Sequence, residues 1–176
     1  MKISNDRFFF VIQSTLKYIS FNWGIRLRSL LYKPFFKSFG KNIEIKDGVT
    51  FKYPSEISIG DHAKIGEFSY FVGKGGLEIG HNFLAGAGTK VITSSHNFSN
   101  LWRPISEQGL EFIPIKIGDD AWLGFDAKVF GGVVIGNGVV VGANTLVNKG
   151  DIPDFSIIVG SPYKIIGNRN EPNPSN

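Results

Sequence analysis

The chain has 176 residues, of which 42% are hydrophobic, and its mean hydropathy is close to zero. This length suits one domain with a buried core and argues against two. The sequence contains no cysteine, which excludes disulfides, thiolate metal ligands and a cysteine nucleophile. The 22 glycines occur without low-complexity proline or serine tracts, so we expect a fold with many tight turns.

The positive charge belongs to the N-terminal segment. Residues 1–41 carry eight Lys and Arg and one Asp, which gives +7, whereas the remaining residues carry eleven basic and fourteen acidic side chains, which gives −3. The apolar run at 8–12 is too short to span a bilayer, and no signal-peptide cleavage site follows it. We predict that residues 1–38 are partly helical and pack on the main domain or on a neighbouring subunit. The charge of residues 1–41 is also compatible with contact to an anionic membrane surface.

An aliphatic residue recurs at every sixth position in the second half of the chain. The series is Ile117, Leu123, Val129, Ile135, Val141 and Val147. Glycine follows the first two members of each set of three and is absent after the third, so the repeating unit is three hexads, or 18 residues. The same triplet occurs earlier in the chain. We predict five units, at 39–56, 59–76, 79–96, 117–134 and 135–152.

This spacing predicts an all-β coil. Six residues with two inward positions make a short strand and a turn, and three such sides close a triangle. We expect the repeat glycines to supply the unusual φ of its corners. Successive triangles then lie about 4.8 Å apart and pair like parallel strands. An α-helix is excluded, because interior glycine every six residues would cost about 1 kcal/mol apiece. We therefore expect a parallel β-helix domain over 39–167, whose coils are stable only as a stack.

Two segments do not follow the repeat. Residues 97–116 fit no hexad and contain Trp102, Pro104, Phe112 and Pro114. A long loop inside a compact domain is often functional, so we expect it to protrude and to contribute to a site. Residues 168–176 are rich in Asn and Pro, and we predict a disordered tail there.

Four stretches resemble the signature of the hexapeptide-repeat acyltransferases, in the branch of maltose, galactoside and O-antigen or capsule sugar O-acetyltransferases. They lie at 117–124, 135–144, 151–153 and 160–166, and the resemblance covers 39–167. It implies a left-handed β-helix, acetyl-CoA as donor, and a homotrimer with active sites in the grooves between subunits. A sugar or lipid-linked glycan would be the acceptor, modified in the cytoplasm or at the inner face of the membrane.

The three histidines occupy different positions of the hexad. His62 is at the fourth position, His81 at the third and His96 at the sixth, so they cannot converge on one ion. This spacing argues against zinc and against the γ-carbonic anhydrases, which share the fold, and we expect no metal. We interpret His62 and His81 as surface residues. His96 ends a coil where the loop begins, and the resemblance places the catalytic base there. A neutral imidazole can take the proton of a sugar hydroxyl.

The resemblance also assigns a cofactor groove and leaves the acceptor site open. The pantetheine arm and phosphates of CoA would contact Phe125, Gly142, Ala143, Asn148, Lys149 and Lys164. Where galactoside acetyltransferases carry acceptor-binding Asn and Asp, this chain has Gly66 and Lys74. We expect Lys74 and Trp102 to contact the acceptor. Glu107 and Glu111 are candidates for orienting the base.

Two other functions remain open at this point. N-acetylation of an amino sugar nucleotide uses the same fold, but usually with a nucleotide-binding domain in front, and this chain lacks the glycine-rich start of such a domain. A non-enzymatic β-helix scaffold is the other alternative, against which His96 and the CoA groove count. We expect no nucleic-acid binding, because no basic RNA-binding motif occurs.

Overall fold

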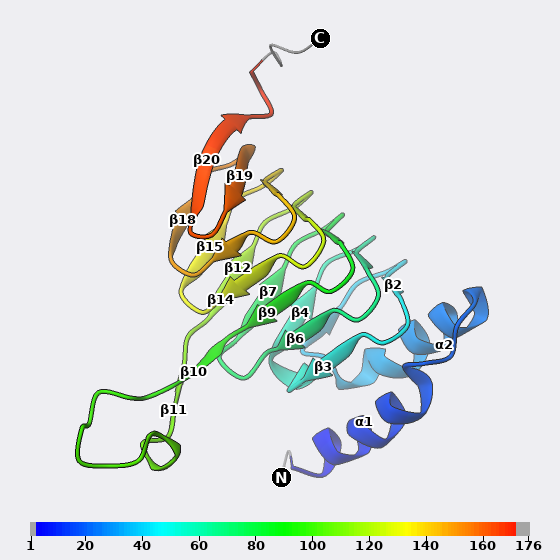
Figure 1. Ribbon diagram of the computed structural model, residues 1–176. Helices are drawn as coiled ribbons and strands as arrows, with labels where there is room; N and C mark the ends of the chain where they lie inside the picture. The colour runs from blue at the N-terminus through cyan, green and yellow to red at the C-terminus, as the bar shows by residue number, and fades with distance from the viewer. Residues whose placement is uncertain (1–2, 172–176) are drawn as a thin grey trace.

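The computed structural model describes residues 3–171, which wind into a three-sided prism (Figure 1). Two helices, α1 (Ile3–Leu16) and α2 (Asn22–Tyr32), lie at the N-terminal end of the prism, and an arm leaves it midway. At the other end the chain closes with an antiparallel strand pair. The predicted fold class, an all-β left-handed parallel β-helix with N-terminal helices and a protruding loop, is confirmed.

Three parallel sheets form the sides of the prism. Side 1 contains β1 (Ser38–Phe39), β4 (Ile57–Ile59), β7 (Leu77–Ile79), β12 (Ile115–Ile117), β15 (Val133–Ile135) and β18 (Gly150–Ile152). Side 2 contains β2 (Glu44–Ile45), β5 (Lys64–Ile65), β8 (Leu84–Ala85), β13 (Trp122–Leu123), β16 (Val140–Val141) and β19 (Ser156–Gly160), followed by the antiparallel β20 (Tyr163–Asn168). Side 3 contains β3 (Thr50–Lys52), β6 (Tyr70–Val72), β9 (Lys90–Ile92), β14 (Lys128–Phe130) and β17 (Leu146–Val147).

The coils extend further than the hexads predicted. Five coils are complete, as expected, but β18 and β19 add two sides of a sixth beyond residue 152. The arm also has different bounds from the predicted loop at 97–116. It begins at β10 (Ser94–His96), which pairs antiparallel with β11 (Leu110–Phe112), and a short 3₁₀ turn, η3 (Ile105–Glu107), lies between them. Residues 115 and 116 already belong to β12, because Ile115 is buried and pairs with Leu77.

The predicted inward residues form the core. Along each side two residues point inward, as in the pairs Ile57 and Ile59 or Val139 and Val141, and both of each pair are buried. Equivalent residues of successive coils stack, so Phe51 lies on Phe71 with ring centroids 5.3 Å apart. Burial of one such side chain contributes about 1.5–3 kcal/mol. Since every coil uses the faces of its neighbours, the domain is stabilised as a continuous column.

The repeat glycines serve close packing between coils. We expected them to supply unusual backbone angles, but the glycine after each inward aliphatic residue does not have a positive φ. Instead, a Cβ at Gly60 would lie 2.6 Å from backbone atoms of Gly80, and a Cβ at Gly124 would lie 2.7 Å from the backbone nitrogen of Ala143. The left-handed corner positions are occupied by residues such as Asn82. Glycine is therefore required because backbone passes directly over backbone.

A ladder of hydrogen bonds runs along the edge between sides 1 and 2. From the second coil on, the residue that follows the glycine on this edge accepts a bond from the backbone N–H of the equivalent residue one coil earlier. Thus Asp61 Oδ1 accepts from Lys41 at 2.7 Å, His81 Nδ1 accepts from Asp61 at 3.0 Å, and Asp119 Oδ1 accepts from His81 at 2.7 Å. The bond from Lys41 is the main reason that the pKa of Asp61 is lowered. The ladder gives His81 a structural role and continues through Asn137 to Asp154.

The two helices cover the open end of the first coil. Gln13 of α1 bonds both backbone groups of Phe51, with its amide nitrogen 3.2 Å from the carbonyl and its oxygen 2.7 Å from the N–H. Arg28 of α2 is fully buried and donates to the carbonyls of Ile45, Leu16 and Ile19 at 2.7–3.1 Å. The bonds to Phe51 and Ile45 satisfy backbone groups of β3 and β2 that would otherwise be an unpaired sheet edge, and those to Leu16 and Ile19 join α2 to the end of α1. Burial lowers the pKa of Arg28.

The C-terminal end is closed differently. The sixth coil lacks a third side, and Tyr163 at the start of β20 packs against the core there, its hydroxyl 3.3 Å from the carbonyl of Lys149. Beyond β20, the backbone N–H of Arg169 donates to Phe155, and its guanidinium pairs with Asp120 at 2.9 Å. Residues 168–171 of the predicted tail therefore have defined contacts, while residues 172–176 lie outside the described part.

Tyr32 offers a test of this N-terminal packing. Its ring is fully buried against Phe9, with the centroids 5.1 Å apart, and its hydroxyl has no hydrogen-bond partner among residues 3–171. Since the hydroxyl is desolvated without compensation, Tyr32→Phe should leave the free energy of unfolding at pH 7 unchanged or raise it by up to about 1 kcal/mol. Denaturant titration measures this, and a loss of more than about 1 kcal/mol would contradict it.

Tyr32 also leads us to expect a loss of folding stability at alkaline pH. Burial raises the pKa of Tyr32 from 10.0 to about 12. The unfolded chain therefore ionises first, so stability that is present below pH 10 is lost as the pH rises towards 12. The phenylalanine variant lacks this contribution, and its advantage over the wild type should increase between pH 9 and pH 11.5, within about that window.

Candidate active site

The arm carries His96 away from the coil. The residue ends β10, faces Leu110 of β11 in the antiparallel register, and is exposed. Side chains alternate along a strand, so His96 and Ser94 share one face of the arm with Leu110, while Ser95 and Glu111 share the other. Glu111 is therefore on the face opposite His96, which does not favour it as the orienting residue. Glu107 lies in η3, beyond the paired strands of the arm, where its carbonyl accepts a bond from Arg103.

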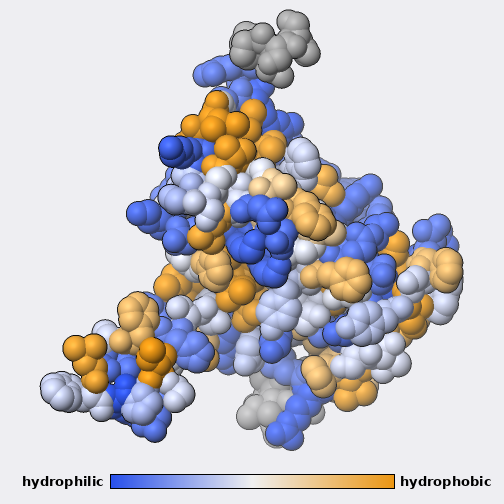
Figure 2. Space-filling model, viewed as in Figure 1, coloured by the Kyte–Doolittle hydropathy of each residue, from blue (hydrophilic) through white to orange (hydrophobic). Residues whose placement is uncertain are grey.

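Hydrogen bonds within the arm hold an apolar tip in water. The side chain of Gln108 bonds the backbone of Asn100 in both directions, at 2.8 and 2.9 Å, and donates to the carbonyl of Arg103. Trp102 beside it is 94% exposed, and Leu101 and Phe98 are also exposed. Figure 2 shows hydrophobic side chains gathered on the arm, where it extends from the prism. The predicted acceptor residue Trp102 thus lies on an ordered surface, with its backbone N–H bonded to Asn100 and its ring exposed.

The edge between sides 3 and 1, which we call the arm edge, brings several predicted residues together. Its segments are 53–56, 73–76, the arm, 131–132 and 148–149. Lys74 lies on it one coil before the arm, with Nζ 4.9 Å from the ring centroid of Tyr53 and 6.0 Å from that of Phe112. A cavity of about 270 Å³ at the base of the arm is lined by Ser95, Phe130 and Asn148, among others. Lys74, His96 and Asn148 therefore share one edge.

Three further predicted cofactor residues, Phe125, Gly142 and Ala143, lie on the edge between sides 2 and 3, which we call the glycine edge. It comprises the turns at 66–69, 86–89, 124–127 and 142–145. Phe125 is 62% exposed, and its carbonyl accepts a bond from the N–H of Asn144. Because of this bond, Ala143 lies directly over Phe125 in the next coil. A Cβ at Gly142 would lie 2.7 Å from Val159, so this glycine too is needed for packing.

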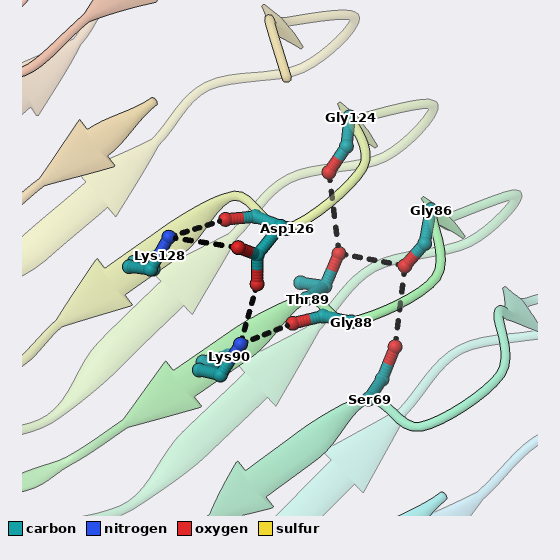
Figure 3. Close-up of polar contacts among 8 residues, drawn as sticks. All are labelled: Ser69, Gly86, Gly88, Thr89, Lys90, Gly124, Asp126 and Lys128. Carbon is teal, nitrogen blue, oxygen red and sulfur yellow. Dashed lines mark hydrogen bonds and ion pairs between the residues drawn. The ribbon is translucent and has the colours of Figure 1, made fainter. Parts of the chain in front are cut away.

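A polar cluster fixes the turn that carries Phe125 (Figure 3). Asp126 accepts from Lys90 of the previous coil and from Lys128 at 3.2 Å, while the hydroxyl of Thr89 donates to Gly86 at 2.8 Å. The hydrogen bonds from Lys90 and then Lys128 lower the pKa of Asp126. The turn is consequently held from two coils, and the exposed ring of Phe125 projects from a fixed backbone.

Lys164 and Lys149 belong to the C-terminal end. Lys164 is exposed on β20 and pairs with Val159 of β19, next to the glycine edge. Lys149 is exposed on the arm edge, and its carbonyl is held by Tyr163. The predicted cofactor residues therefore form two groups on two edges, with side 3 between them. Within residues 3–171, His96 and Phe125 thus lie on different edges of the prism.

A larger cavity, of about 690 Å³, lies elsewhere. It is at the edge between sides 1 and 2, where the half-exposed Trp122 meets His62, Asn82 and Arg169. None of the predicted catalytic or cofactor residues lines it. Within residues 3–171 no group of three His, Asp or Glu side chains could hold a metal ion. None of the helices described there is both long and apolar enough to cross a membrane.

Known proteins share the repeat and the whole architecture. The family model described as bacterial transferase hexapeptide (six repeats) matches residues 114–149. The putative colanic acid biosynthesis acetyltransferase WcaF of Escherichia coli (strain K12) is 32% identical over 146 residues, which cover 83% of this chain and 77% of the relative. The chain belongs to the hexapeptide-repeat acyltransferases. The family expected from the sequence is confirmed, and with it the enzyme class.

Solved hexapeptide-repeat acyltransferases extend the likeness to the helices and the C-terminal end. An acetyltransferase from Vibrio cholerae, solved with acetyl coenzyme A, is 25% identical with a TM-score of 0.85 and covers 96% of this chain and 88% of its own. A galactoside acetyltransferase solved with coenzyme A is 26% identical with a TM-score of 0.84. A probable acetyltransferase of Mycobacterium tuberculosis is 32% identical, and the chain spans 43% of its length.

Proposed function

We propose that this acyltransferase moves the acetyl group of acetyl-CoA to a sugar hydroxyl during assembly of a polysaccharide or lipid-linked glycan. The observation that carries the proposal is the place of His96, exposed where the arm leaves the coil. It shares its edge with Lys74 and Asn148, beside a cavity at the base of the arm. The names of the relatives support the acceptor class, since WcaF is a putative colanic acid biosynthesis enzyme. We assign the reaction to the cytoplasm.

The proposed chemistry is direct transfer. The neutral imidazole of His96 accepts the hydroxyl proton as the sugar oxygen attacks the thioester carbonyl. A backbone N–H stabilises the negative oxygen of the tetrahedral intermediate. The C–S bond then breaks, and the imidazolium returns the proton to the leaving thiolate, which gives the acetyl ester and CoA. No cysteine is available for an acyl-enzyme.

The residues on the glycine edge fit the donor. Phe125 and Ala143 present exposed apolar surface one above the other, which suits the pantetheine arm. Lys164 and Lys149 are exposed cations near the C-terminal end, which suit the phosphates. These contacts bind and orient acetyl-CoA, and such positioning is itself a large part of catalysis in group transfer.

The separation of the two groups supports a homotrimer. Since side 3 lies between the arm edge and the glycine edge, a complete site requires the arm edge of one copy to meet the glycine edge of the next. Sedimentation should therefore give three times the 19.4 kDa of one chain. A chain that sediments as a monomer at micromolar concentration and still transfers acetyl groups would contradict the shared site.

Replacement of the base tests the mechanism. His96→Ala should lower acetyl transfer by about 10²–10⁴-fold, because general-base assistance is lost. The trimer and its melting temperature should stay nearly unchanged, since the side chain is exposed. His62→Ala is the matched control, because His62 is also exposed but lies on another edge. The acid limb of the pH profile of kcat/KM should disappear in the His96 variant alone.

The O-acetyl content of the glycan is the decisive readout. NMR before and after mild alkali separates O-acetyl groups, which are removed, from N-acetyl groups, which remain. Loss of the alkali-labile acetyl group with His96→Ala and its retention with His62→Ala supports the proposal. If the His96 variant keeps more than about a tenth of the wild-type transfer, another residue is the base.

Lys164 tests the donor site. Lys164→Ala should raise the KM for acetyl-CoA and change kcat less, as expected when a contact made equally in the ground and transition states is removed. The effect should decrease at high salt, because the exposed ion contact is screened. Lys116→Ala, at an exposed position of side 1, is the control. An unchanged KM for acetyl-CoA would exclude Lys164 from the phosphate site.

A further inference from the structure

Helix α1 buries one face and leaves large apolar side chains exposed on the rest of its surface. Phe9 and Leu16 pack into the protein together with Gln13. Phe8, Phe10 and Val11 on the helix, and Tyr18 just after its end, are 59–64% exposed. Polar side chains such as Arg7 and Ser14 are exposed among them. Exposed apolar side chains gathered among polar ones are typical of an interaction surface.

Helix α2 presents a mixed stripe on its outer face. Trp23, Arg26 and Leu30, followed by Lys33 directly after the helix, are exposed at helical spacing, so apolar and basic side chains alternate along one line. Before the helix, Phe21 is 79% exposed and has φ 80° and ψ 165°. That conformation is almost confined to glycine, so an exposed phenylalanine is held there against its backbone preference. In Figure 2 hydrophobic and polar side chains interleave over this end of the molecule.

The basic residues gather around a groove between α2 and the first coil. The groove has a volume of about 450 Å³ and is lined by Arg26, Lys33 and Lys41, with Leu30 and Phe39 among its apolar walls. Two carboxylates are near these cations. Glu44 also lines the groove but pairs with Lys64 at 3.4 Å, and Asp61 accepts the backbone N–H of Lys41. The groove therefore keeps a positive excess beside apolar surface.

We propose that this N-terminal end docks on an anionic phospholipid bilayer. Lipid phosphates would occupy the groove beside Arg26, Lys33 and Lys41, and the exposed aromatic residues of both helices would enter the interfacial layer. Tryptophan and tyrosine suit that layer, because each combines an apolar ring with a polar N–H or O–H, and phenylalanine adds apolar area. The charge favours this partner over a second copy of the same end, because two surfaces that each belong to a +7 segment repel each other.

The docking is independent of acetyl transfer. None of the residues that form this surface is among those assigned to the base or the donor site, and binding can be measured without substrate. It would bring the enzyme to an acceptor carried on a lipid. No covalent step is involved, so the proposal requires only a favourable binding free energy from charge and apolar burial.

Flotation of the full-length protein with vesicles tests the proposal. Vesicles of phosphatidylcholine alone are compared with vesicles containing about a third phosphatidylglycerol. The protein should float with the second and remain behind with the first, and raising the salt to about 0.5 M should release it. Equal recovery with both vesicles, or recovery with neither, would overturn the proposal.

Paired variants separate a surface effect from net charge. Arg26→Glu should weaken binding by about fivefold or more, whereas Lys116→Glu, with the same change of net charge on side 1, should change it by less than about twofold. Trp23→Ala should weaken binding at low salt without altering the salt sensitivity. An equal effect of Arg26→Glu and Lys116→Glu would refute a defined surface. A change of oligomeric mass with Arg26→Glu would show that this face is an interface between copies, which also overturns the proposal.

Discussion

The close approach of successive coils is the constraint on which the rest of the molecule depends. At two of the three edges the backbone of one coil passes so near the next that a single Cβ would come within 2.6–2.7 Å of backbone atoms. Glycine at those corners allows the strands to pair in register and the inward residues to stack into one column. The same approach brings Asp61, His81 and Asp119 within reach of the N–H groups one coil earlier, so side chains add a further line of hydrogen bonds.

The third edge differs from the other two in the length of its connecting segments, and the candidate site lies there. These segments run from two residues at 131–132 to the whole arm. Glycine is still needed where backbone passes closely, since a Cβ at Gly75 would lie 2.5 Å from the backbone oxygen of Thr93. The coil tolerates the insertions because they leave the prism at a corner, outside the paired strands. Lys74, His96 and Asn148 are all on this edge. Two edges with uniform turns thus form the scaffold, and the variable edge carries the candidate site.

The six-residue period was sufficient to predict the β-helix, its inward residues and the departure of the arm near His96. Other features depend on contacts that a period does not contain. The reason for the repeat glycines was predicted wrongly. Close backbone approach and a positive φ both select glycine, so the sequence does not distinguish between them. The sixth coil was missed because Ser156 replaces an aliphatic residue at an inward position after β18. Which arm face holds Glu111 depends on the register of β10 with β11. In the proposed site the distance between His96 and Phe125 would depend on a second copy, which the sequence of one chain does not specify.

The two closures of the prism determine how long it can be. A β-helix has no inherent end, since its last coil always offers a row of backbone groups on which another coil, or another molecule, could continue. Gln13 and Arg28 occupy those groups on the first coil, and β20 together with Tyr163 occupies the last. The closing elements therefore act as stoppers, and they keep a fold that could grow into a filament as a particle of fixed size.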